Sequence, residues 1–260
     1  MIYEIEKRES AEYIFANWQE TLIWSCLQGV MGHIYANDME NPTSAMAILG
    51  DFCFFAGTPD KELIAYKPEW CKQDFIIAVP QNDQWAGLLE DYYGDKAKQV
   101  VRYAIKKEPD IFDKSKLNDI VESLPSEYTI KMIDEKLFNY CRNEQWCRDL
   151  VSQFADYQIY NKIGLGVVIL KDGVPVSGAS SYSAYLDGIE IEVDTKKEYQ
   201  RKGLALVCGA RLILECLDRG LYPSWDAQNL WSVALAEKLG YHFDYAYNAY
   251  EIQDYQLKES

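Results

Sequence analysis

Residues 189–205 read IEIEVDTKKEYQRKGLA and change character twice along their length. Residues 189–193 alternate apolar and acidic side chains, which is typical of a β-strand. A polar loop follows. From Gly203 to Asp218 the apolar residues recur at helical spacing, and Gly220 closes that pattern. The stretch therefore predicts a strand, a glycine-containing loop and a helix in direct succession.

This succession favours binding of a phosphate group. The first N–H groups of a helix have no acceptor inside the helix, so they carry partial positive charge and attract anions. Gly203 and the small Ala205 leave room beside the backbone, and Arg201 and Lys202 add charge. The spacing matches neither G-x-x-x-x-G-K-[ST] nor G-x-G-x-x-G. A structural alternative stays open, in which Gly203 only begins the helix and the two cations are a solvated pair.

An antiparallel meander is predicted before the loop. Asp172-Gly173 and Asp187-Gly188 are hairpin signals that separate strands at 166–170, 174–185 and 189–193. The rest of the second half is predicted to hold strands at 128–132, 222–225 and 241–252 and helices at 134–154, 203–218 and 229–239.

The first half has weaker patterns and no evident chemistry. It is predicted to hold a helix at 10–29, a hairpin at 45–55, strands at 75–79 and 100–105 and a helix at 83–93. The polar stretch 107–126 is bracketed by Pro109 and Pro125 and resembles a linker. The expected fold class is therefore mixed α/β (α+β), with an N-terminal α/β domain over 1–125 and a second domain over 126–260.

Composition excludes several classes of protein. A formal net charge of -15 disfavours nucleic acid and anionic membranes as partners and is compatible with a cationic substrate. No segment has the roughly 20 apolar residues of a membrane span, and the N-terminus does not resemble a signal peptide. The seven cysteines are scattered, and His33 and His242 are the only histidines. We therefore expect reduced thiols, a cytoplasmic location, no metal site and no Cys-His or Ser-His hydrolase.

The loop Gln200-Arg201-Lys202-Gly203-Leu204-Ala205 resembles the Q/R-x-x-G-x-G/A motif of the Gcn5-related N-acetyltransferase (GNAT) superfamily. The preceding strand resembles the fourth strand of that fold, with a passage into the loop about two residues longer. Residues 229–241, which end in Lys238-Leu239-Gly240-Tyr241, resemble the closing element of the family. The resemblance covers about 128–252 and is closest to a bacterial subgroup with an extra N-terminal half. That half would be a substrate lid or a degenerate acetyltransferase-like half.

The resemblance implies that acetyl-CoA is the cosubstrate and suggests where it binds. Pantetheine would lie along Val193, Asp194 and Thr195, where this strand parts from the strand ending at Trp225. The pyrophosphate would lie on Arg201 to Ala205. Asn229 is either a helix N-cap or a cofactor contact, and both roles are compatible. Ser232 either contacts the cofactor or simply faces the loop.

Catalytic candidates follow from the same resemblance. Strict alternation places Glu190 and Glu192 on one face of their strand, and in this fold that strand faces the acetyl group. Either carboxylate is a candidate general base for an amine whose free pKa is roughly 10. Asp226 is a third candidate, for orienting the ammonium or making a turn.

One position departs from the family. The tyrosine that commonly protonates the leaving thiolate is replaced here by Ala236. Tyr182, Tyr241 and Tyr245 are nearby in the sequence, and the pattern does not choose among them. The resemblance therefore predicts where CoA binds more firmly than it predicts the chemistry.

The function expected is acetyl transfer from acetyl-CoA to a primary amine of a small molecule or peptide by direct attack. The main alternative is a non-catalytic CoA-binding regulatory module, with which Ala236 is compatible. A dinucleotide-dependent oxidoreductase is disfavoured by the missing G-x-G-x-x-G and by the meander. A protein-interaction domain would bind no CoA. The acceptor amine and the oligomeric state stay open, with a homodimer among the possibilities.

Overall fold

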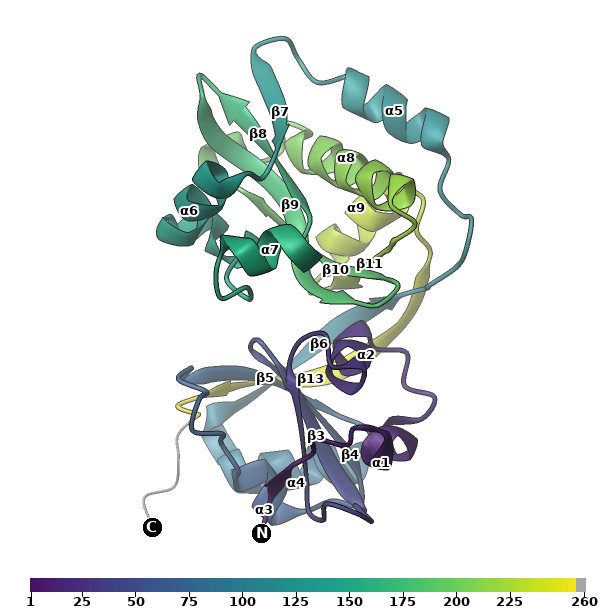
Figure 1. Cartoon of the computed structure of the whole chain (residues 1–260), viewed down its shortest axis with the longest axis vertical. Coiled ribbons are helices and arrows are strands. Elements are labelled where there is room, and N and C mark those ends of the chain that lie inside the picture. Colours follow the sequence, from purple (N-terminus) through teal and green to yellow (C-terminus); the bar gives the residue numbers. More distant parts are fainter. Residues whose placement is uncertain (256–260) are drawn as a thin grey trace. The chain divides into compact units, whose positions relative to one another are not determined.

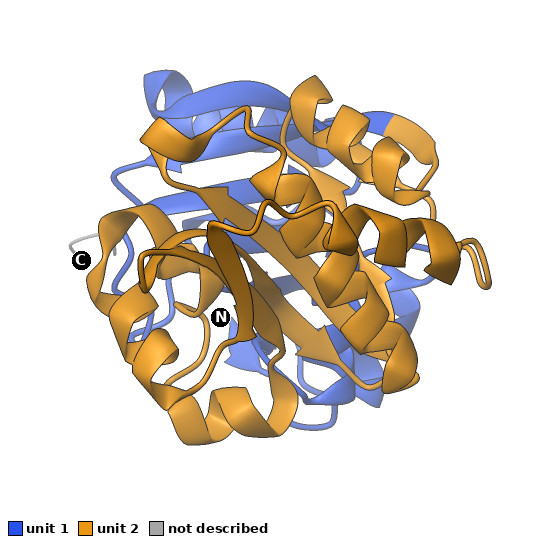
Figure 2. Cartoon of the chain, turned by 90° about the horizontal axis from the view of Figure 1, so that it is seen from above, with its two compact units in different colours: residues 1–102, 246–260 blue, residues 103–245 orange. Residues whose placement is uncertain are grey.

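The chain folds into two compact units, and this computed structural model describes residues 1–255. The first unit comprises residues 1–102 and the described residues from Ala246 onward, and the second comprises Tyr103–Tyr245 (Figure 2). Two strands, β6 (Ala97–Ile105) and β13 (Phe243–Gln253), contribute residues to both units. The remaining helices and strands each belong to one unit.

The first unit is built on one sheet. Its strands, apart from the two shared ones, are β1 (Tyr3–Glu4), β2 (His33–Ala36), β3 (Ser44–Leu49), β4 (Phe52–Gly57) and β5 (Phe75–Pro80). Its helices are α1 (Glu9–Glu12), α2 (Thr21–Gln28), α3 (Lys61–Ala65) and α4 (Asp83–Tyr93), with 3-10 turns at Tyr13–Phe15 and Gly94–Lys96. β2, β3 and β4 pair antiparallel, whereas β5 lies parallel to β4. Trp85 of α4 and Phe55 of β4 are buried in its core, with rings 5.5 Å apart.

The second unit has a five-stranded sheet in the order β11-β10-β9-β8-β7. Its strands are β7 (Tyr128–Met132), β8 (Gly166–Lys171), β9 (Val174–Tyr185), β10 (Gly188–Thr195), β11 (Tyr222–Ser224) and, outside that sheet, β12 (Asp226–Ala227). Its helices are α5 (Lys114–Glu122), α6 (Glu135–Asn143), α7 (Tyr157–Ile163), α8 (Leu204–Asp218) and α9 (Leu230–Leu239), with 3-10 turns at Gln145–Leu150 and Lys197–Tyr199. α6 and α7 lie on one side of the sheet and α8 on the other (Figure 1).

Both units use the same order of elements. In each, a strand and two helices precede three antiparallel strands, then a helix leads to a fourth strand parallel to the third, and another helix follows. In the first unit the crossing helix is the five-residue α3, and in the second it is the 15-residue α8. The chain therefore contains two copies of one topology, with a long helix after the third meander strand only in the second.

The predicted meander is confirmed, with β8, β9 and β10 pairing antiparallel. The predicted hairpin of the first half is also present as β3 and β4, and Gly50 turns it with a φ of +60°. That left-handed angle suits glycine because it has no Cβ. The helix predicted at 83–93 has those bounds in the structure, and Asn82 caps it by accepting the N–H groups of Gln84 and Trp85.

Two helix predictions were wrong in extent, and one helix was missed. The helix expected at 10–29 is interrupted at Ala16–Glu20, where Asn17 has a φ of +66°, and α2 begins only at Thr21. The helix expected at 134–154 ends at Asn143 and continues as a 3-10 turn. The supposed linker 107–126 contains α5, whose N-cap Asp113 accepts the N–H groups of Ser115 and Lys116.

The units also divide at a different place from the expected boundary near residue 125. α5 packs against α8 and Leu117 is buried, so residues 103–125 belong to the second unit. The C-terminal strand β13 pairs antiparallel with β5, with Tyr250 opposite Ala78, and so belongs in part to the first unit. Strand pairing between distant segments causes this division, and no local composition signal marks it.

Candidate functional site

The loop between β10 and α8 presents an open helix N-terminus. Gly203 is the N-cap of α8, with a φ of +81° and no side-chain hydrogen bond at the cap. A Cβ placed on Gly203 would meet no atom within 4 Å, so space in front of the helix is clear. Val207 N–H donates to Gly203 O at 3.2 Å, which leaves the preceding N–H groups of the first turn, at Leu204 to Leu206, directed out of the helix. This geometry suits an anionic group.

The residues before Gly203 hold the loop in shape. Gln200 donates from Nε2 to Thr195 O at 3.2 Å, which ties the loop back to the end of β10. Lys202 Nζ lies 4.6 Å from the centroid of the Tyr199 ring. Arg201 has a φ of +60°, an uncommon angle for a residue other than glycine. The side chains of Arg201 and Lys202 are both exposed, directly before the N-terminus of α8.

β10 and β11 run together only briefly. Their parallel pairing covers Gly188 to Glu190 against Tyr222 to Ser224 and ends there among the described strands. β10 continues to Thr195 while pairing with β9 on its other edge. The edge toward β11 is unpaired in this stretch, which includes the half-buried residues Val193, Asp194 and Thr195. Thr195 Oγ1 lies 2.7 Å from Ser177 Oγ of β9. The backbone edge of β10 is therefore available along the segment that the sequence predicted for pantetheine.

A β-bulge interrupts the register between β10 and β9 beside Glu190 and Glu192. Glu190 pairs with Ser183 of β9, but Ile191 pairs with Ser181 and Glu192 with Ser180, so the register shifts between Glu190 and Ile191. The extra residue of the bulge is Tyr182 of β9, because Ser183 and Ser181 pair with successive residues of β10. β10 itself has no insertion here, and the shared face of the two glutamates stays a prediction.

The two glutamates have different surroundings. Glu190 is 6% exposed, and its charge contributes to the raised pKa values of Tyr185, Tyr222 and Tyr241, for which burial is the largest cause. Glu192 is half-buried, and its Oε1 accepts the N–H of Val193 at 3.2 Å. Glu190 lies on the last rung before β10 and β11 part, so it is the carboxylate at the opening between these strands.

Three predicted site residues lie after β11, one in β12 and two at the start of α9. Asn229 is the N-cap of α9, and its Oδ1 accepts the N–H of Ser232 at 3.0 Å. Ser232 Oγ also accepts from Trp225 Nε1 at 3.0 Å, so these two residues hold the start of α9. Asp226 lies in β12, half-buried, opposite Ala104 of β6.

Ala236 is fully buried in α9 and cannot supply a proton. Among the tyrosines near it in sequence, Tyr241 is buried and donates from its hydroxyl to Pro223 O. Burial holds the pKa of Tyr241 well above its usual range. Tyr245 is exposed, and Tyr182 is buried in β9. Because its hydroxyl is already committed to Pro223, Tyr241 is a poor candidate for the general acid.

Asp194 has an environment that the sequence did not reveal. Burial, together with the negative charge of Asp149, raises the pKa of Asp194 to about 7. The folded chain thus keeps the proton to a higher pH than the unfolded chain, in which an aspartate titrates near 3.9. The free energy of unfolding therefore has its full contribution from the protonated Asp194 below about pH 4. It loses that contribution as the pH rises from about 4 through 7.

We predict that Asp194→Asn gains stability over the parent as the pH rises, because asparagine cannot ionise. The difference in the free energy of unfolding should grow from pH 4 and reach about 2 kcal/mol at pH 8. Urea unfolding at a series of pH values measures it, with Asp119→Asn as a control because Asp119 is exposed on α5. A difference for Asp194→Asn that stays constant with pH would contradict the buried carboxyl.

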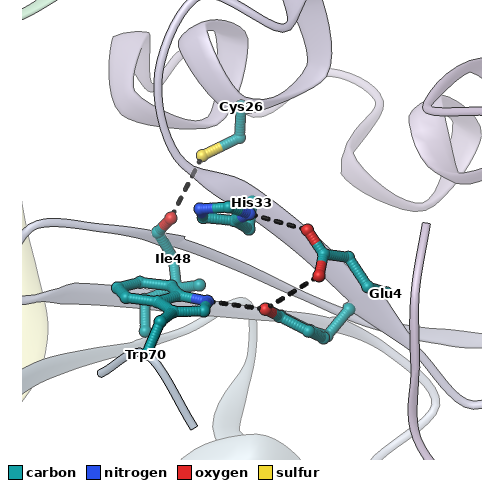
Figure 3. Close-up of polar contacts among 6 residues, drawn as sticks. Glu4, Cys26, His33, Ile48 and Trp70 are labelled. Carbon is teal, nitrogen blue, oxygen red and sulfur yellow. Dashed lines mark hydrogen bonds and ion pairs between the residues drawn. The ribbon is translucent and has the colours of Figure 1, made fainter. Parts of the chain in front are cut away.

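Cys26 and His33 lie close to each other in the first unit, and both side chains have other partners (Figure 3). The Cys26 sulfur donates to Ile48 O, and burial raises the pKa of this thiol to about 12. His33 Nδ1 lies 2.7 Å from Glu4 Oε1, and the centroid of its ring lies 4.7 Å from that of the Trp70 ring, with the planes tilted by 33°. The protonated thiol and the engaged imidazole therefore cannot act as a nucleophile and its base.

The fold is mixed α/β with a helix N-terminus open to an anionic group, and comparison with known proteins identifies its class. The family model described as GNAT acetyltransferase matches residues 12–250, and the chain belongs to this family. Members use acetyl-CoA as cosubstrate. The match includes the first unit, so the family extends well beyond the 128–252 region that the sequence motifs covered.

Individual relatives agree with this assignment. An uncharacterised N-acetyltransferase of Bacillus subtilis strain 168, YdfB, is 29% identical over 246 residues, which is 88% of this chain and 89% of that protein. A GCN5-related N-acetyltransferase-like protein from Streptococcus suis 89/1591 is 48% identical, with a TM-score of 0.89 over 95% of this chain and 99% of that chain.

A more distant structure shares the fold. A tandem GNAT protein from the clavulanic acid biosynthesis pathway is 9% identical, with a TM-score of 0.56 over 98% of this chain and 99% of that chain. Within residues 1–255, no helix combines the length and apolar character needed to cross a bilayer. In the same residues, no group of three or more His, Cys, Asp or Glu side chains is placed to hold a metal ion.

Sequence reasoning did not single out Ser183, Ser224 or Asp149. Ser183 and Ser224 pair with Glu190 across two neighbouring strands, and Asp149 acts on Asp194 from a different segment. One signal was present for the first of these. The strand 174–185 contains Ser177, Ser180, Ser181 and Ser183, an unusual number of hydroxyl groups for a strand that is otherwise apolar.

Proposed function

We propose that this protein transfers the acetyl group of acetyl-CoA to a primary amine of a small molecule or peptide by direct attack. The observation that carries the proposal is the clear N-terminus of α8 at Gly203, without a side-chain cap, which one loop connects to a strand whose edge toward β11 is unpaired beyond Glu190. Acetyl-CoA supplies the activated acetyl group. Its pyrophosphate needs an anion site, and its pantetheine needs a free strand edge next to that site.

The residues fit that cosubstrate. The N–H groups at the start of α8, with Gln200 to Ala205 around them, would hold the pyrophosphate. The free edge of β10 at Val193, Asp194 and Thr195 would pair with the amide groups of pantetheine. Backbone N–H groups of β10 beyond Glu190 would polarise the thioester carbonyl. Asn229 and Ser232 would act indirectly, by fixing the start of α9 through the bonds to Trp225 and to each other.

We assign the general base to Glu190. It lies on the rung where β10 and β11 part, next to the segment proposed for pantetheine, and an amine there must lose a proton before it attacks. Glu192 is the alternative, and its contact with its own neighbouring N–H places it less well for proton transfer. Asp226 would orient the substrate ammonium. The net charge of -15 favours approach of a cationic acceptor.

Of the two readings of the first unit, a substrate lid or a degenerate acetyltransferase-like half, we propose the degenerate half. Its order of elements repeats that of the second unit, but its α3 differs at the N-terminus from α8. Asp60 Oδ1 accepts the N–H groups of Glu62 and Leu63 at 2.8 and 3.4 Å. A carboxylate thus already occupies the position that a phosphate would take, and the helix has only five residues.

This difference predicts one CoA for each chain, although the topology occurs twice. Isothermal titration calorimetry of the full chain with CoA should give a stoichiometry close to one. Asp60→Asn serves as the control, because it removes the charge at α3 and should leave the stoichiometry unchanged if α3 is too short to bind. Two sites of comparable affinity would contradict the assignment of the first unit.

A cytoplasmic location is proposed because the seven cysteines are free thiols, as in a reducing compartment. A non-catalytic CoA-binding module is the second candidate function, favoured by the buried Ala236 and the committed hydroxyl of Tyr241. Turnover of acetyl-CoA with a panel of polyamines, amino acids, aminoglycosides and peptides separates the two. Binding of CoA with no acetylated product from any of these classes would favour the second candidate.

A further inference from the structure

Ser183 of β9 carries a buried hydroxyl that has no protein partner. Its side chain is 0% exposed, and its Oγ accepts or donates no hydrogen bond among the described residues. A buried hydroxyl without a partner destabilises a fold, so we expect Ser183 to have a role other than stability. Alanine would fill the same place on the strand at no such cost.

The other three serines of β9 show how this strand normally treats a hydroxyl. Ser177 Oγ lies 2.7 Å from Thr195 Oγ1, and Ser180 Oγ lies 2.8 Å from the Tyr160 hydroxyl. Ser181 Oγ accepts the N–H of Leu165 at 2.9 Å. All four are buried. Ser183 therefore differs from neighbours of the same type on the same strand.

The position of Ser183 connects it to the proposed site. Its Cα partner across the antiparallel pair is Glu190, and the partner of Glu190 across the parallel pair is Ser224. Ser224 Oγ in turn lies 3.0 Å from the Tyr185 hydroxyl. Residues directly opposite on neighbouring strands share a face, so Ser183, Glu190 and Ser224 form one polar row. This row is the last before β10 and β11 part.

We infer that Ser183 is a positioning residue, whose hydroxyl and the Glu190 carboxylate together hold one water for deprotonation of the acceptor. Opposite residues have Cβ atoms about 4.5–5.5 Å apart, a spacing that a bridging water spans. A buried water needs about three partners, and Ser183, Glu190 and the acceptor nitrogen provide them. This inference rests on the proposed acetyl transfer and on Glu190 as its base.

The proton transfer needs no other reagent. An N–H bond of the ammonium breaks as an O–H bond forms on the water. A different O–H bond of that water breaks as the proton goes to a carboxylate oxygen of Glu190. The amine lone pair is then free to attack, and Ser183 keeps its own proton throughout.

The test compares Ser183→Ala with the parent in the full chain. Loss of the water should lower kcat about tenfold and move the acidic limb of the kcat/KM profile to higher pH, while the Kd for CoA stays within twofold. The Tm should stay the same or rise, since an unpaired hydroxyl is removed. Ser180→Ala is the matched control on the same strand: it removes a bonded hydroxyl, so it should lower the Tm and leave the pH profile unchanged.

The outcomes separate this inference from the proposed function. A Ser183→Ala chain with the parent rate and pH profile overturns the role of Ser183, as does a lowered Tm with an unchanged pH profile. If Glu190→Gln loses activity in the same experiment, the proposed function still stands. If the parent acetylates no amine, the proposed function fails first, and the role of Ser183 fails with it.

Discussion

Glu190→Gln is expected to lower kcat for acetyl transfer by about a thousandfold, within the range that general base catalysis supplies. Glutamine keeps the shape of the side chain on its rung between Ser183 and Ser224 but cannot accept a proton. The amine must then lose its proton to solvent. We expect kcat/KM of the variant to rise tenfold per pH unit up to the pKa of the free amine, about 10. The parent should level off at a lower pH.

Glu192→Gln is the matched comparison, because it removes an identical charge two residues away on the same strand. Glu192 already accepts the N–H of Val193, and we expect its loss to lower kcat by less than about tenfold. Calorimetry should give the parent Kd for CoA in both variants, since neither residue lies in the Gln200–Ala205 loop. A large loss in Glu192→Gln with near-normal Glu190→Gln would move the base to Glu192.

Gly203→Asp is expected to weaken CoA binding by about a hundredfold or more, which corresponds to about 3 kcal/mol. The new carboxylate would take the free N–H groups at the start of α8 and repel the pyrophosphate. The fold should survive, because a Cβ at Gly203 meets no atom within 4 Å and aspartate both caps helices and tolerates a positive φ. Calorimetry measures the affinity, and circular dichroism and the Tm report the fold.

Gly203→Asn separates charge from shape. Asparagine matches aspartate in size and also tolerates the left-handed angle, but it brings no negative charge. We expect it to weaken binding by about tenfold, less than aspartate does. Normal CoA affinity in Gly203→Asp, in a chain that folds like the parent, would show that the pyrophosphate is not bound at this helix.

The sequence predicted the loop and the meander because both depend on local signals. The turns at Asp172-Gly173 and Asp187-Gly188 and the alternation around them set the strands β8, β9 and β10. Gly203 and the apolar periodicity beyond it set α8. The motif of six residues then supplied the family, which the match over residues 12–250 confirms.

Other features depend on pairing between distant residues, which spacing does not encode. The bulge of β9 opposite Glu190 and Ile191 depends on the register between β9 and β10, and the row from Ser183 to Ser224 joins three strands. The short helix α5 was missed because its polar sequence resembles a linker, while its stability comes from packing Leu117 and from the Asp113 cap. The roles assigned to Glu190, Glu192 and Asp226 stay predictions until the variants are measured.

The pairing of the C-terminal strand β13 with β5 of the first unit has a consequence for folding during synthesis. β5 ends at Pro80, yet its antiparallel neighbour is β13, which is made more than 150 residues later. During synthesis at roughly 5–20 residues per second, the first sheet must therefore wait with an open edge for many seconds. An open edge of apolar strands can pair with other chains. We therefore expect the interval before Tyr250 reaches Ala78 to be when the nascent protein is most exposed to aggregation, and most dependent on chaperones.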